Sequence, residues 1–75
     1  METKYIVWGK MPLGAGYLRI ENGKRHWGSY FDAQSFTADE IDEVLSKIGR
    51  EWTWKCYVAG TNDIYKQHEA HYIYV

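Results

Sequence analysis

The segment from Phe36 to Gly49 constrains the fold most, because every local signal in it predicts one helix. Thr37 and Glu40 have the spacing of a capping box, in which each side chain accepts a hydrogen bond from the backbone N–H of the other residue. Gly49 can end the helix in a left-handed conformation. The apolar residues recur at helical spacing and form one stripe: Ile41, Val44, Leu45 and Ile48. A helix with a single apolar stripe needs a surface to cover, so we expect a sheet beneath it.

A hairpin is predicted from residue 17 to residue 30, around Asn22-Gly23, a dipeptide typical of two-residue turns. Such a turn fixes the register and places Leu18 opposite Trp27. Alternation then divides the side chains between two faces. One face carries Leu18, Ile20, Trp27 and, beyond the strand, Phe31, and we expect it to hold the helix. The other carries Tyr17, Arg19, Glu21, Lys24, His26 and Tyr30.

Three further segments read as strands from their β-branched and aromatic content: residues 4–10, 51–59 and 64–75. The first does not alternate cleanly, so we expect it to be central and covered on both faces. Residues 11–16 are expected to form a loop. The sequence thus predicts one α+β domain over residues 1–75, with the order β-β-β-α-β-β. An antiparallel sheet of four to five strands carries one helix on one face. Whether the strands joined by the helix run parallel is left open.

Composition excludes several classes of function. A single cysteine cannot form an internal disulfide and fits a reducing cytoplasm, and no apolar run has the roughly 18 residues that a membrane span needs. A metal site would have to combine Cys56, His68 and His71 with Asp63 or His26, and we predict neither a metal nor another cofactor. No nucleophile motif is present, so we predict a protein that is not an enzyme.

Two binding surfaces remain as hypotheses. The first is a protein-binding surface made of acidic helix residues and nearby exposed tyrosines: Asp39, Glu40, Asp42, Glu43, Tyr30 and Tyr57. The alternative is a nucleic-acid-binding face in which basic and aromatic residues of the hairpin interleave: Tyr17, Arg19, Lys24, Arg25 and His26. The net charge of −1 opposes the alternative, because such affinity depends on phosphate contacts. A third expectation is a homodimer formed through an edge strand ending at residues 72–75.

The middle of the chain resembles small orphan proteins encoded by bacteriophages and prophages. The resemblance lies in Gly16-Tyr17-Leu18, Trp27, the run from Ala33 to Thr37, and Glu40-Ile41. It implies a cytoplasmic protein of the bacterial host cell that binds and inhibits a host factor or defence complex, as anti-CRISPR proteins do. It implies no catalytic residues.

Overall fold

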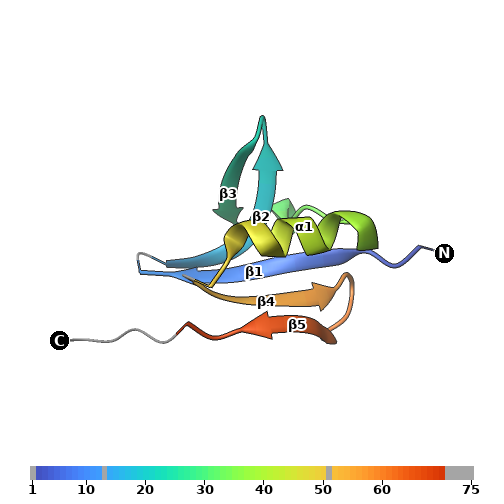
Figure 1. Cartoon of the computed structure of the whole chain (residues 1–75). Helices are drawn as coiled ribbons and strands as arrows, with labels where there is room; N and C mark the ends of the chain where they lie inside the picture. The colour runs from blue at the N-terminus through green and yellow to red at the C-terminus, as the bar shows by residue number, and fades with distance from the viewer. Residues whose placement is uncertain (1, 13, 51, 71–75) are drawn as a thin grey trace.

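The computed structural model describes residues 2–12, 14–50 and 52–70. Its elements confirm the predicted α+β class and the order β-β-β-α-β-β (Figure 1). The strands are β1 (Tyr5–Met11), β2 (Gly14–Glu21), β3 (Lys24–Gly28), β4 (Thr53–Val58) and β5 (Ile64–His68). The short 3-10 turn η1 (Tyr30–Asp32) follows β3, and the helix α1 (Ala38–Ile48) precedes β4.

The five strands form one sheet in the order β3-β2-β1-β4-β5, and each neighbouring pair is antiparallel. The helix therefore joins two strands, β3 and β4, that do not lie side by side. The predicted central place of the first strand is confirmed, since β1 is the middle strand. The expectation that both its faces are covered is wrong, because α1 packs on one face only.

The β2–β3 hairpin has the predicted register, with Leu18 opposite Trp27 and Arg19 opposite His26. Positive φ angles of 53° at Asn22 and 76° at Gly23 make the tight turn. Figure 1 shows this hairpin leaving the plane of β1, β4 and β5 and standing beside α1. Pairing between β1 and β2 begins at the turn that joins them and extends to Trp8 and Tyr17.

The chain before α1 fills the space where β1 and β2 diverge. Tyr5 and Phe36 exchange two backbone hydrogen bonds of 2.8 Å. Gln34 donates its backbone N–H to the Leu18 carbonyl oxygen at 3.0 Å, and its side-chain oxygen accepts from Ile20 N–H at 2.8 Å. These bonds satisfy backbone groups that the diverging strands would otherwise leave unpaired. They also place the Phe36 ring in the core.

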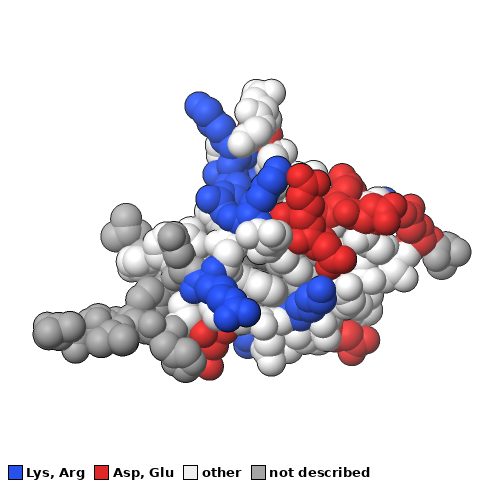
Figure 2. All heavy atoms as spheres, viewed as in Figure 1, with Lys and Arg blue, Asp and Glu red and all other residues white. Residues whose placement is uncertain are grey.

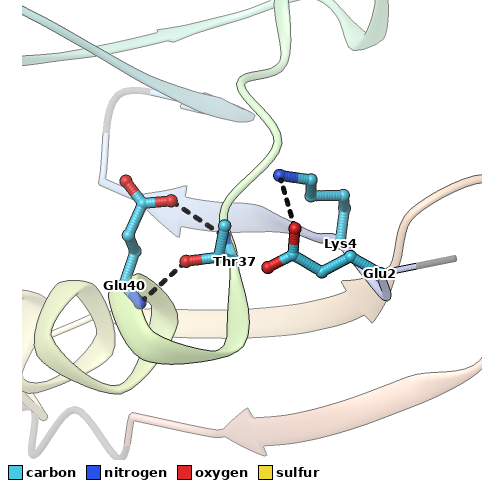
Figure 3. Close-up of polar contacts among 4 residues, drawn as sticks. All are labelled: Glu2, Lys4, Thr37 and Glu40. Atoms are coloured by element: carbon cyan, nitrogen blue, oxygen red, sulfur yellow. Dashed lines mark hydrogen bonds and ion pairs between the residues drawn. The ribbon is translucent and has the colours of Figure 1, made fainter.

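The predicted capping box is present at the start of α1 (Figure 3). Thr37 donates its backbone N–H to Glu40 Oε1 at 2.9 Å, and Glu40 donates its backbone N–H to Thr37 Oγ1 at 3.3 Å. The first of these bonds stabilises the carboxylate and lowers the pKa of Glu40. At the other end of the helix, Gly49 has a φ of 70° and donates to the Leu45 carbonyl oxygen.

The core lies between α1 and one face of the sheet. Its buried side chains are Val7, Leu18, Phe36, Ile41, Leu45, Ile48, Trp54 and Cys56. Val44, the remaining member of the predicted stripe, packs against them half-buried, as do Ile20 and Trp27. The helix stripe and its sheet partners are therefore as predicted, with one exception.

That exception is Phe31, which is 95% exposed rather than part of the core. Its predicted place extended the hairpin alternation past Gly28, where β3 ends. The chain turns there through Ser29 and η1, and Phe36 takes the core position instead. Two boundaries also differ. The predicted loop 11–16 shrinks because β2 starts at Gly14, and β5 ends at His68. Residues 71–75 lie outside the described part of the chain.

Candidate binding face of the sheet

The face of the sheet that α1 leaves uncovered, here called the open face, carries aromatic and basic side chains. Alternation along β1 and β4 sends Val7 and Cys56 to the core, so Trp8 and Lys55 point the opposite way. Strand register places a row of direct neighbours across four strands: Tyr17, Trp8, Lys55 and Gln67. The Lys55 ammonium lies 6.0 Å from the centre of the Trp8 ring. This row mixes planar rings with a cation.

Beside this row lies a hollow of about 390 Å³, here called the tyrosine hollow. It is lined by Ile6, Tyr17, Tyr30, Tyr57 and the loop residues Gly60, Thr61 and Asn62. Ile6 is 6% exposed yet is not part of the core cluster under α1. Neighbouring side chains on the open face therefore cover it. The volume is within the roughly 300–1,000 Å³ typical of ligand sites.

Hydrogen bonds and ring contacts fix the walls of the tyrosine hollow. The Tyr17 and Tyr30 rings meet edge to face, with centroids 5.3 Å apart and planes at 86°. On the opposite wall, Thr61 donates both its backbone N–H (3.1 Å) and its hydroxyl (2.8 Å) to the Val58 carbonyl oxygen. The Thr61 hydroxyl in turn accepts from Asp63 N–H at 3.0 Å. The hollow is thus preformed.

Positive charge predominates among the strand side chains of the open face. In the described strands, Lys10, Arg19, Lys24 and Lys55 alternate onto this face together with one carboxylate, Glu21. A second carboxylate, Glu69, follows β5 and lines a hollow with Trp8 and Lys55. Arg19 lies 3.4 Å from Glu21, and both side chains are about half exposed, so water screens this pair. The three lysines have no ion-pair partner within the described part of the chain. They remain available to an anionic ligand.

Negative charge gathers on the other side of the molecule. Asp39, Glu40, Asp42 and Glu43 are exposed on α1, and Figure 2 shows acidic side chains collected over this helix. Two of the four are paired: Asp42 with Lys66 at 3.1 Å and Glu43 with Lys47 at 3.2 Å. The Asp42 pair raises the pKa of Lys66 through its hydrogen bond and charge. Lys47 and Lys66 lie on this side as well, and Figure 2 shows basic side chains next to the acidic ones, so the helix side carries charges of both signs.

The structure divides the predicted protein-binding residues. The four carboxylates lie on α1, whereas Tyr30 and Tyr57 line the tyrosine hollow on the opposite face. The alternative, nucleic-acid-binding set is mostly brought together. Tyr17, Arg19, Lys24 and His26 share the open face, and only Arg25, the register partner of Ile20, points to the helix side.

Four residues that the open face contributes to the candidate site were not identified from the sequence: Ile6, Trp8, Lys10 and Lys55. Alternation does place Lys55 and Tyr57 on one side of a strand. However, their neighbours on β1 are separated from them by about fifty positions, and only the pairing of β1 with β4 shows that Trp8 lies beside Lys55. That pairing carries no local sequence signal.

The structure does not bring the remaining candidates together within its described residues. Cys56 is fully buried, and burial raises the pKa of its thiol to about 11. No group of three potential metal ligands gathers among residues 2–12, 14–50 and 52–70, while His71 lies outside these ranges. Within the same ranges, no helix has both the length and the apolar character needed to cross a membrane.

Comparison with models of known protein families, with curated proteins and with solved structures found no match to this chain.

Proposed function

We propose that this protein is a small, non-enzymatic binding protein that holds unpaired nucleic acid against the open face of its sheet. One observation carries the proposal. The tyrosine hollow continues into the row of Trp8 and Lys55, so aromatic rings and cations alternate across one preformed surface. The predicted protein-binding set lacks this continuity, because it is split between two faces.

The chemistry of an unpaired strand matches this surface. Every base offers a flat π-face, and stacking on a protein aromatic ring contributes about 1–3 kcal/mol per base. Tyr17, Tyr57 and Trp8 are half-buried, so each ring is supported from below and still reaches solvent. Double-stranded nucleic acid keeps its bases stacked inside the helix and cannot use these rings. The proposed ligand is therefore single-stranded.

The phosphates of such a strand need nearby cations, and the open face has them. Lys55 sits over Trp8, and Lys10 lies two residues further along β1 on the same face. The objection from net charge applies to the whole molecule and not to this face, because the carboxylates of α1 are on the other side. With three or four cations involved, the affinity should be modest and sensitive to salt.

Matched substitutions test this proposal. Tyr57→Leu and Lys55→Gln change the open face, while Tyr65→Leu and Lys47→Gln change an aromatic residue and a lysine on the helix side. Binding of a fluorescent single-stranded 12-mer is followed by anisotropy at low salt. We expect the first pair to weaken binding about 5-fold or more, and the second pair to have little effect. Equal losses in both pairs, or no binding by the wild-type protein, would reject the proposal.

Inhibition of a bacterial protein, as the resemblance to phage proteins implies, stays a prediction. What supports it is the separate acidic surface of α1, which is complementary to a basic partner. A cytoplasmic location in the bacterial host belongs to the same prediction. The predicted homodimer through residues 72–75 concerns a segment outside the described ranges, and light scattering tests it directly.

A further inference from the structure

Phe31 is the most exposed large apolar side chain in the described part of the molecule, at 95%. An exposed phenylalanine forgoes the 1.5–3 kcal/mol or so that burial of such a side chain contributes. Its chain neighbour Tyr30 is 51% exposed and lines the tyrosine hollow. The two rings meet edge to face, with centroids 6.2 Å apart. Phe31 thus extends the aromatic surface beyond the rim of the hollow.

The backbone holds Phe31 in this exposed place. Asp32 N–H donates to the Ser29 carbonyl oxygen at 3.1 Å, and Ala33 N–H donates to the Tyr30 carbonyl oxygen at 3.1 Å. The Ser29 hydroxyl also bonds the Asp32 carboxylate at 3.2 Å. Phe36 already fills the nearby core and is 2% exposed. The ring cannot turn inward without displacing Phe36 and breaking this turn.

Tyr30 connects Phe31 to the hollow through two edge-to-face contacts, one with Tyr17 and one with Phe31. Its ring acts as a spacer between two places where a planar group can stack. The nearest carboxylate, Asp32, is bonded to Ser29 and lines a separate depression with Arg19 and His26.

From this arrangement we propose that Phe31 is a second stacking platform, so that the site takes two consecutive unpaired nucleotides. One base occupies the tyrosine hollow, and the base next to it stacks on Phe31. This inference rests on the proposed function and adds to it the minimal ligand, a two-nucleotide step. Because every base has a π-face, the site tolerates any sequence.

The test combines a protein change with a ligand change. The ligands are an oligothymidylate 8-mer and an 8-mer in which every second nucleotide is abasic. In the second ligand, no two consecutive nucleotides both carry a base. The proteins are wild type, Phe31→Ala, Phe31→Trp and, as a matched control, Tyr65→Ala. Phe31 and Tyr65 are both exposed, so melting temperatures are recorded to show that each variant is folded.

We expect Phe31→Ala to lose roughly 5- to 150-fold in affinity for the complete 8-mer, the range of one stacked base. Phe31→Ala should lose much less affinity for the 8-mer with alternating abasic nucleotides. On that ligand, even wild type cannot place consecutive bases in the tyrosine hollow and on Phe31. Phe31→Trp should restore binding, and Tyr65→Ala should bind like wild type.

Two results would overturn this inference and leave the proposed function standing: full affinity in Phe31→Ala, or an equal loss on both ligands. Failure of wild type to bind either 8-mer at low salt would reject the proposed function itself, and the inference with it.

Discussion

At the scale of single residues, close contacts decide which side chains are tolerated. Gly9 lies under the Trp27 ring, and a Cβ atom built at Gly9 would be 2.5 Å from Trp27 Cζ3. The absence of a side chain at Gly9 lets the Trp27 indole ring of β3 lie over β1 and pack against the core. The glycine is therefore required by packing and not by an unusual backbone angle.

Gly9→Ala should lower the free energy of unfolding by about 1–3 kcal/mol, because the ring must shift in a packed region. Gly28→Ala is the matched control, since its added Cβ would meet only Asp32 Oδ2 at 3.9 Å. Urea denaturation measures both. Similar midpoints for the two variants would show that Trp27 moves aside at little cost.

The buried thiol of Cys56 gives a second prediction at this scale. Its pKa is about 11 in the folded protein, compared with an ordinary value of 9.0, and burial is the main cause. Below pH 9 the thiol is protonated in both states and has no effect on the pH dependence. Above pH 9 the unfolded chain loses the proton first, so the folded state loses stability as pH rises from about 9 to 11.

The slope from this thiol should approach about 1.4 kcal/mol per pH unit. Other groups titrate in the same range, so Cys56→Ala serves as the reference, and the difference between the two unfolding curves isolates the thiol. We expect wild type to lose stability faster than Cys56→Ala above pH 9. Parallel curves would mean that the thiol reaches solvent.

At the scale of elements, the sequence predicts what is local and misses what is not. The helix and the hairpin carry their signals within a few residues: Thr37 and Glu40 at one, Asn22-Gly23 at the other. Phe31 was misplaced because alternation says nothing about where a strand ends. The tyrosine hollow was missed because its walls come from β1, β2, η1, β4 and the loop after β4, which only the strand order brings together.

The helix also provides a prediction that separates the two binding hypotheses. Replacing Asp39, Asp42 and Glu43 by Asn, Asn and Gln removes three negative charges from the face opposite the proposed site. Oligonucleotide binding should stay within about 3-fold of wild type or become tighter, because long-range repulsion falls. Loss of oligonucleotide binding in a folded variant would assign the contact to α1. Loss of binding to a bacterial protein alone would support the inhibitor hypothesis.

At the scale of the whole molecule, the proposed function depends on the separation of the open face from the carboxylates of α1. Strand register places Lys10, Lys24 and Lys55 on the face of the sheet opposite to the one that α1 and its carboxylates cover. A strand of nucleic acid can approach the open face without meeting the carboxylates of α1. Net charge does not show where the charges lie. It therefore opposed nucleic-acid binding in the sequence analysis, whereas the position of the lysines on the open face supports it.

The most direct measurement is the affinity of the wild-type protein for a single-stranded 12-mer and its duplex over a series of salt concentrations. The proposed function predicts binding to the single strand, weaker binding to the duplex, and a slope of log K against log salt of about −2 to −3. That slope corresponds to three or four phosphate contacts at about 0.7 each. No binding of the single strand at the lowest salt, or tighter binding of the duplex, would contradict it.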